Sequence, residues 1–463
     1  MKVSPKRKFQ FIVASAIFSG FIPIAAQAQT KPDTQTPRLD RSEARAMINQ
    51  LLREGKIMRA DSAKRGMRGI GRSVFQGGKI EEFKIEVIGT LKKVMGGGDL
   101  VLIKVLDGPV VKRQSGIIAG MSGSPVYING KMLGAIAIGF GFPKEPIGGV
   151  TPITQMIEGA LPDNAETKRT ASVTTRPTKQ HLTTFAPETY RAVKPLAIGG
   201  QRFSQVVVSR DFQSSAKGSK GLAMPGALVG RPCNMLMQLS GFSPASLPRL
   251  KQMFEPWGIE PVIGTGGAMK GPMAQVQAFS SAGNKTDANP PFVPGGAIGV
   301  PLVTGDLDMS GVGTITFRWG KRILAFGHPM FGKGAVSMPM TSAYIHDIFP
   351  SYQQSFKLAS PVREVGALQQ DTEFAIGGTI GRRADMVPMH VRLKNAERGI
   401  DRSYNVRLIK DPLFTPMLLQ MVGAETLAGA FGMDSDKMVR VKFRMQLEGL
   451  PAVEKQDFLY AQS

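Results

Sequence analysis

The residues of this chain that could do chemistry centre on one short segment, Gly120-Met121-Ser122-Gly123-Ser124-Pro125. Its glycines permit a sharp backbone turn around the Ser122 hydroxyl, directly before a predicted strand. A serine attacks a carbonyl carbon only if its oxygen protrudes and backbone N–H groups converge on the oxyanion that forms. The segment is therefore a candidate nucleophile turn, and the alternative is an ordinary Gly/Ser turn without chemistry.

A nucleophilic serine needs a base to take its proton, and histidine is scarce in this chain. His328, in Gly327-His328-Pro329, follows a predicted β-hairpin whose strand end could hold it rigidly, so we favour it as the base, although a structural role fits the same pattern. His346 is the reserve candidate. His181 lies in a polar linker and His390 in a strand-like run, and we interpret neither as a base.

The third role is a carboxylate that orients the base. Asp107 ends the apolar run Leu100 to Leu106, where an acid could be partly buried and kept ionised by hydrogen bonds. The alternative is a solvated turn aspartate before Gly108. Three other aspartates remain open as orienting acids: Asp99, Asp306 and Asp308.

Other reaction classes find little support in the motifs. The Gly-x-Ser-x-Gly elbow of α/β-hydrolases is not met, because Ser124 occupies its last position. The sequence has no H-E-x-x-H pattern, no His/Cys cluster, and no phosphate or dinucleotide loop in a strand-turn-helix context. Cys233 is the only cysteine, which excludes an intrachain disulfide. We expect no metal and no cofactor.

The N-terminus predicts export. Lys2, Lys6, Arg7 and Lys8 precede the apolar stretch Phe9 to Ala25, and Ala26-Gln27-Ala28 supplies a cleavage site. This is the pattern of a signal peptide over residues 1–28, with a mature chain from Gln29 in the periplasm or outside the cell. The alternative is an uncleaved membrane anchor, for which the apolar run is short.

The chain is strongly basic, with a net charge of +23 over 463 residues. Removing the four basic residues of the signal peptide leaves about +19, a surface that favours anionic envelope partners. The basic residues are scattered, no aromatic-rich binding motif accompanies them, and the export signal makes an encounter with nucleic acid unexpected. We interpret the charge first as a solvated surface.

The pattern along the chain is mostly β, with glycine-rich turns and a few helices, which favours barrels or sandwiches. Phe83, Ile85 and Val87 alternate with polar residues as in a half-buried strand, and Asn129-Gly130 predicts a tight hairpin. A leader with an amphipathic helix over Asp40 to Glu54 precedes the strands. Helices are also expected near Ser246 to Phe254 and Pro412 to Phe431, and a strand over Met438 to Leu447.

Two stretches resemble SpoIVB-type serine peptidases (family S55). These are sporulation-signalling proteases whose fold is usually placed near the trypsin-like two-barrel fold. Residues 68–160 resemble the nucleophile half, through Glu81 to Val87, Gly116 to Pro125, and Asn129 to Ala135. Residues 293–335 are similar to the histidine half, through Pro294 to Val300, Gly313 to Phe317, and Ala325 to His328. The second similarity extends at most to residue 395 and is the weaker one.

The resemblance implies that Ser122 is the nucleophile and that Asp107, fifteen residues upstream, is the acid. The N–H groups of Gly120 and Ser122 would form the oxyanion hole. The family runs histidine, acid, serine, whereas this chain runs Asp107, Ser122, His328, a cyclic permutation that is tolerable where the termini of a domain lie close together. The PDZ domain of sporulation members is not evident.

We therefore expect a permuted trypsin-like two-barrel core with an inserted central region and a C-terminal α+β extension. The expected segments are a leader over 29–66, S55-like segments over 67–160 and 293–395, a linker and inserted region over 161–292, and an extension over 396–463. The expected function is a secreted serine endopeptidase acting on protein or peptide substrates. The alternatives are a non-catalytic envelope-binding protein on the same fold and an esterase that uses the same site.

Overall fold

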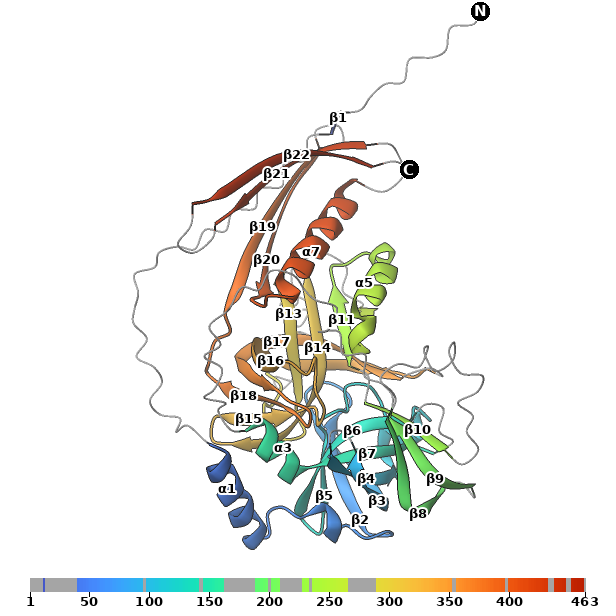
Figure 1. Ribbon diagram of the computed structural model, residues 1–463. Coiled ribbons are helices and arrows are strands. Elements are labelled where there is room, and N and C mark those ends of the chain that lie inside the picture. The colour runs from blue at the N-terminus through green and yellow to red at the C-terminus, as the bar shows by residue number, and fades with distance from the viewer. Residues whose placement is uncertain are drawn as a thin grey trace, which may run out of the picture.

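The computed structural model shows a mostly β chain built around two closed rings of strands (Figure 1). It describes residues 11–12, 40–94, 97–140, 145–161, 188–198, 201–208, 227–232, 235–264, 289–351, 355–395, 399–431, 437–446 and 451–461. The predicted signal peptide lies outside these residues except for β1 (Phe11–Ile12), which pairs with β21. In the described part of the chain, no helix has both the length and the apolarity needed to span a membrane.

The first barrel contains the serine-rich turn. Its strands pair in the cyclic order β5-β2-β3-β4-β7-β6, and pairing of β5 with β6 closes the ring. Side chains alternate along β3, with Phe83, Ile85 and Val87 buried inside, as the sequence predicts. Asn129 and Gly130 both have positive φ and form the predicted hairpin turn. The strands are β2 (Arg68–Val74), β3 (Ile80–Val94), β4 (Gly98–Val105), β5 (Pro125–Ile128), β6 (Lys131–Phe140) and β7 (Ile147–Pro152).

The second barrel carries the histidine loop. Its strands pair in the cyclic order β14-β15-β18-β17-β16-β13, and pairing of β13 with β14 closes the ring. The longest pair, β16 and β17, forms an arm that extends over the first barrel in Figure 1. The strands are β13 (Ala297–Gly305), β14 (Asp308–Trp319), β15 (Arg322–Ala325), β16 (Gly334–Phe349), β17 (Phe356–Asp371) and β18 (Ile376–Ile380).

The central region extends both sheets. It adds β8 (Glu188–Ile198), β9 (Gln201–Val208) and β10 (Ala227–Pro232) to the first barrel through β6, and β11 (Leu236–Ser240) and β12 (Glu260–Ile263) to the second through β14. A further pair, β19 (Met386–Asn395) and β20 (Ile400–Ile409), joins β13. Part of the predicted inserted region thus forms strands that pair with strands of the two barrels.

The helices pack on the strands and on one another, and the longest one, Phe414–Phe431, lies on β19 and β20. The helix predicted near the N-terminus is α1, which begins with a capping box between Asp40 and Glu43. The helices and 3₁₀ turns are α1 (Arg41–Arg53), Ala60–Ser62, α2 (Gly108–Lys112), α3 (Ile153–Ala160), Pro244–Ser246, α5 (Leu247–Phe254), Glu255–Trp257 and α7 (Phe414–Phe431). A last hairpin, β21 (Lys437–Met445) and β22 (Val453–Ala461), lies near the C-terminus.

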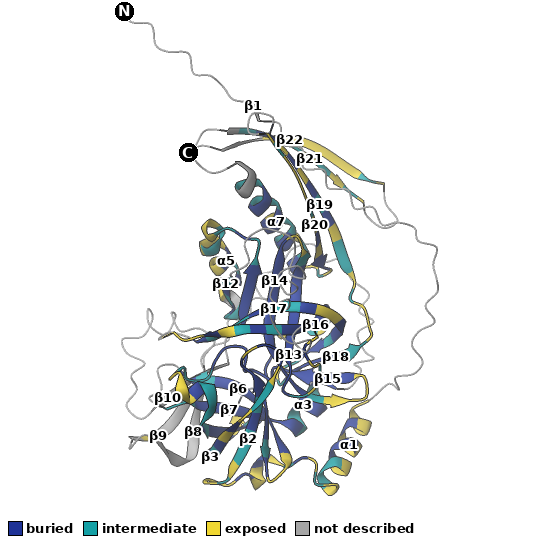
Figure 2. Ribbon diagram, turned by 180° about the vertical axis from the view of Figure 1, so that it is seen from behind, coloured by how far each residue is buried: buried dark blue, intermediate teal, exposed yellow. Residues whose placement is uncertain are grey.

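The buried residues form a continuous dark interior through both barrels in Figure 2. The largest core cluster fills the second barrel and the space under α5 and α7, and a separate cluster fills the first barrel. The mostly β, trypsin-like two-barrel class predicted from the sequence is confirmed. The structure leaves the permuted order and the segment boundaries as predictions.

Candidate active site

The turn that carries Ser122 lies between α2 and β5 and requires its glycines. Gly120 has φ +95° and Gly123 has φ +92°, backbone conformations that side chains strain. A Cβ on Gly123 would stand 1.9 Å from the carbonyl oxygen of Thr314. The second glycine is therefore needed for the close approach of the second barrel.

Strand β14 of the second barrel holds this turn by three hydrogen bonds. The N–H of Thr314 donates to the Ser122 carbonyl oxygen at 2.8 Å, and its hydroxyl donates to the Gly120 carbonyl oxygen at 2.9 Å. The hydroxyl of Thr316 donates to the Gly123 carbonyl oxygen at 2.7 Å. The candidate nucleophile thus belongs to one barrel and is fixed by the other.

Two backbone N–H groups of the turn have no acceptor within the described part of the chain: those of Gly120 and Ser122. The carbonyl oxygens of the preceding residues are anchored, Ala119 by the N–H of Lys357 at 3.0 Å and Met121 by the N–H of Ser124 at 2.8 Å. Because the carbonyl and N–H of a trans peptide point in opposite directions, these anchors fix where both N–H groups point. Such a pair can bind an oxyanion.

The Ser122 hydroxyl itself is buried, with 1% of the residue exposed. Its Oγ makes no hydrogen bond to any described residue. No hydrogen bond therefore joins Ser122 to His328 in this structure. Catalytic hydrogen bonds are often long in a site without substrate and tighten when substrate binds.

His328 follows β15, at the end of a strained turn. Phe326 has φ +70° and Gly327 has φ +74°, and a phenylalanine in this region costs about 1–3 kcal/mol. The loop is packed on the first barrel, because the Thr151 hydroxyl donates to the Gly327 carbonyl oxygen at 2.7 Å. Backbone strain of this kind is concentrated at functional sites.

The imidazole of His328 is buried and oriented by the backbone. Its Nδ1 lies 2.8 Å from the carbonyl oxygen of Pro329. Since a carbonyl oxygen only accepts, Nδ1 carries the proton, and Nε2 is the basic nitrogen of the neutral ring. Its ring also contacts that of Phe326, with centroids 5.8 Å apart.

The serine turn and the histidine loop meet at Gly313 on β14. A Cβ on Gly313 would stand 2.3 Å from the ring of Phe326 and 3.1 Å from the Ser122 carbonyl oxygen. The structure thus brings the segments of Ser122 and His328, 206 positions apart in the chain, to the same glycine.

Asp107 is not joined to either residue. One carboxylate oxygen accepts the backbone N–H of Lys84 at 2.6 Å, and the other lies 3.5 Å from the Lys84 ammonium. Its side chain is 44% exposed. The role of Asp107 as an orienting acid stays a prediction, and in this structure its contacts are to β3.

The other candidates have partners of their own. The reserve base His346 contacts the Ser360 hydroxyl at 2.8 Å, and burial lowers its pKa. His390 contacts Asn405, and His181 lies outside the described residues. Of the alternative acids, Asp99 pairs with Lys92 and Asp306 accepts the N–H of Asn405, while Asp308 is bonded to the Ser310 hydroxyl. Burial raises the pKa of Asp308 to about 7.

Comparison with known families supports the nucleophile segment. Residues 40–155 match the family model described as SpoIVB peptidase S55. The resemblance predicted for the segment that carries Ser122 is confirmed. The match covers α1 and the first barrel, including Ser122 and Asp107, and ends before the His328 loop. No curated protein and no solved structure matches the chain.

The sequence did not point to Asp371, which holds the loop after His328. Its carboxylate is buried and accepts the N–H groups of Met330 and Phe331, each at 2.7 Å. Burial raises its pKa, and these backbone hydrogen bonds oppose the rise. Asp371 therefore fixes the path of the chain beyond the candidate base.

A second group that the sequence did not point to lies behind the serine turn. We call it the lysine–hydroxyl cluster, and its members are Ser73, Ser124, Thr314 and Lys357. The Lys357 Nζ donates to the Ser73 hydroxyl at 2.8 Å, and the Ser124 hydroxyl donates to the same oxygen at 2.9 Å. Burial lowers the pKa of Lys357 to about 7. A lysine in an alternating strand gives no sequence signal that it is buried.

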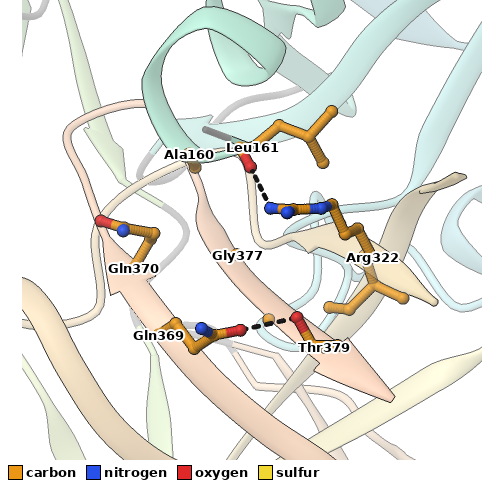
Figure 3. A pocket seen from close by; sticks show the side chains of 9 residues that line it. Ala160, Leu161, Arg322, Gln369, Gln370, Gly377 and Thr379 are labelled. Carbon is orange, nitrogen blue, oxygen red and sulfur yellow. Dashed lines mark hydrogen bonds between the residues drawn. The ribbon is translucent and has the colours of Figure 1, made fainter. Parts of the chain in front are cut away.

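A polar pocket lies at the opposite end of β15 from the histidine loop (Figure 3). There Arg322 donates to the Leu161 carbonyl oxygen at 2.9 Å, and Thr379 donates to Gln369 at 2.6 Å. The pocket lies between the end of α3 and the second barrel, and it shares no residue with the serine turn. Among the described residues, no group of three or more His, Cys, Asp or Glu side chains could hold a metal ion.

Proposed function

We propose that the protein is a serine endopeptidase in which Ser122 is the nucleophile and His328 the general base. The observation that carries the proposal is the serine turn of the S55-like segment. The turn offers two oriented N–H groups, on either side of Met121, that have no acceptor among the described residues. The match to a peptidase family indicates protein substrates.

In the proposed reaction, the Ser122 Oγ attacks the scissile carbonyl carbon while its proton passes to Nε2 of His328. The N–H groups of Gly120 and Ser122 bind the oxyanion, and each donor of this kind contributes about 3–4 kcal/mol to lowering the barrier. His328 then returns the proton to the leaving amine, and water hydrolyses the acyl-enzyme by the same route.

In the proposed site a backbone carbonyl group, not a carboxylate, orients the ring of His328. The Pro329 carbonyl oxygen fixes the tautomer through Nδ1, which is the role that an aspartate has in a Ser-His-Asp triad. Asp107 would take that role only after leaving Lys84, and its present contacts do not support it.

We also propose that the protein acts outside the cytoplasm, since its sequence begins with a signal-peptide pattern. N-terminal sequencing of protein from the periplasmic fraction is expected to begin at Gln29. A chain that keeps residues 1–28 would contradict this part of the proposal. The basic surface would favour acidic substrates or an anionic envelope surface.

The test is labelling by a fluorophosphonate probe together with hydrolysis of casein. We expect the folded wild-type protein to be labelled and active, and Ser122→Ala to lose both properties. Ser115→Ala, at a neighbouring half-buried serine whose hydroxyl is bonded to the Val110 carbonyl oxygen, should keep them. Casein hydrolysis that persists in Ser122→Ala would overturn the proposal. Cleavage of small acyl esters with intact casein would instead indicate an esterase.

A second candidate is a non-catalytic binding protein on the same fold. The burial of the Ser122 hydroxyl, and its lack of a hydrogen bond to His328, favour this alternative. A folded protein that neither reacts with the probe nor cleaves casein would support it.

A further inference from the structure

The lysine–hydroxyl cluster connects three elements to the nucleophile turn. Ser73 lies on β2, Thr314 on β14 and Lys357 on β17, and Ser124 is the last serine of the turn. All four residues are buried, with at most 1% exposed. The Ser73 and Thr314 hydroxyls lie 3.5 Å apart, and the Thr314 hydroxyl donates onward to the Gly120 carbonyl oxygen at 2.9 Å.

Lys357 contacts the turn through its backbone, its side-chain carbons and its amine. Its backbone N–H donates to the Ala119 carbonyl oxygen at 3.0 Å, which fixes the peptide that carries the Gly120 N–H. Its side-chain carbons pack against Gly120, where an added Cβ would meet them at 3.1–3.3 Å. Its amine reaches Ser124 and Thr314 through Ser73. One residue therefore supports the oxyanion donor from the backbone, the stem and the amine.

The surroundings favour a neutral amine. An ammonium has three N–H donors, and among the described residues it has one hydrogen-bond acceptor, the Ser73 hydroxyl. The face of the Phe75 ring, 5.5 Å away, attracts a cation but replaces neither of the two missing acceptors. Burial is the cause of the lowered pKa of Lys357, and the value of about 7 places the charge change near neutral pH. Protonation would leave a buried charge short of acceptors.

The charged groups on the neighbouring elements do not compensate this charge. On β2, Arg72 pairs with Glu82, and on β16, Asp347 pairs with Arg113. His346 contacts Ser360, and Asp308 of β14 is bonded to Ser310. β11 contributes Gln238, which is uncharged and binds the backbone of β17. Residues 118–124 of the turn contain no charged side chain.

We propose that Lys357 is a positioning residue of the active site, whose neutral amine holds the Gly120–Ser124 turn in its catalytic geometry through Ser73 and Thr314. The inference rests on the proposed peptidase function and adds a second group that must be deprotonated besides His328. Protonation of Lys357 would draw its donors toward the carbonyl oxygens of the turn and displace the Gly120 N–H. A misplacement of about 1 Å can cost about 100-fold in rate.

The first test is the pH profile of kcat/KM for casein-derived peptides. Because two groups must lose a proton, log kcat/KM for the wild type is expected to rise with a limiting slope of two on the acid side. Lys357→Met keeps the buried stem without a titrating amine, and it is expected to show a slope of one, with kcat about 100-fold lower at the optimum and KM within about threefold. Asp308→Asn, which removes another buried group whose pKa burial shifts to about 7, is the control and should keep the slope of two.

The second test uses the unmodified protein and does not depend on a variant that folds. NMR of protein labelled at lysine ¹³Cε and backbone ¹⁵N should show one lysine that titrates near pH 7, with the Gly120 and Ser122 amide signals moving at the same midpoint. A slope of two that persists in Lys357→Met, or amide signals that stay still while the lysine titrates, would overturn the inference. An inactive wild type would instead refute the proposed function, and this inference with it.

Discussion

The carbonyl oxygen of Ser122 accepts the backbone N–H of Thr314 at 2.8 Å, which ties the candidate nucleophile of the first barrel to β14 of the second. The Ser122 Oγ takes no part in this bond. The geometry of the turn therefore depends on how closely the two barrels approach each other.

That approach can be tested at Gly123. Gly123→Ala would place a Cβ 1.9 Å from the Thr314 carbonyl oxygen, and we expect a loss of more than about 4 kcal/mol in the free energy of unfolding. Gly130→Ala is the matched control, because Gly130 has φ +74° but no atom within 4 Å of an added Cβ. It should cost only about 1–2 kcal/mol. Equal losses in urea titrations of the two variants would contradict the packing described for the turn.

Substitution of His328 and of His346 tests which histidine is the base. His328→Ala is expected to lower kcat about 10³- to 10⁴-fold or more, since it removes the proton acceptor of Ser122, while the circular dichroism spectrum stays unchanged. His346→Ala removes a side chain bonded to Ser360 on the β16–β17 arm and should change kcat by less than about threefold. The reverse order of effects would assign the base to His346.

Substitution of Asp107 and of Asp371 should lower activity to very different extents. Asp107→Asn removes a half-exposed carboxylate bonded to Lys84, and we expect kcat/KM to fall by less than about fivefold. Asp371→Asn replaces one of the two oxygens that accept the Met330 and Phe331 N–H groups, so the His328 loop should loosen and kcat fall more than about tenfold. A loss of about 10⁴-fold in Asp107→Asn would restore the role that the family resemblance gives it.

The buried amine also predicts how stability depends on pH. The pKa of Lys357 is lowered from 10.5 to about 7 in the folded protein, so between these values the unfolded chain binds one more proton. The free energy of unfolding should therefore rise with pH over this window, by up to about 1.4 kcal/mol per unit from this group alone.

Lys357→Met removes that dependence. We expect the variant to be more stable than the wild type at pH 7, by an amount that shrinks as the pH rises toward 10.5. Lys84→Met, at an exposed lysine of β3, should leave the shape of the wild-type curve unchanged. Urea titrations between pH 7 and 10 measure both differences, and parallel curves for Lys357→Met and the wild type would contradict the expected sign.

The sequence predicted a mostly β chain with tight glycine turns because these features depend on local pattern, and the two-barrel class followed from the family resemblance. The alternation at Phe83, Ile85 and Val87, and the Asn129-Gly130 turn, are signals carried within a few residues. Two closed barrels then bring Gly313 and Phe326 to Ser122 through long-range pairing, which no window of the sequence contains.

The supporting residues could not be predicted in the same way. Lys357 stands in an alternating strand as a surface lysine would, and its burial depends on long-range pairings of β17 with β16 and with Ala119 of the serine turn. Asp371 likewise ends β17 without any motif, and its role is set by the backbone N–H groups of a distant loop. For Asp107 the local pattern pointed to a role that the contacts do not show. Its position at the end of a buried strand predicted a contact with the base, whereas in the structure its carboxylate accepts the backbone N–H of Lys84.

The shared boundary between the barrels has a pharmacological consequence. Because the hydroxyls of Thr314 and Thr316 reach across it to hold the serine turn, a small molecule that separates the barrels would disturb the turn without resembling a substrate of the proposed peptidase. Inhibition of the proposed peptidase by such a molecule would be non-competitive, and a screen at saturating peptide would select for it.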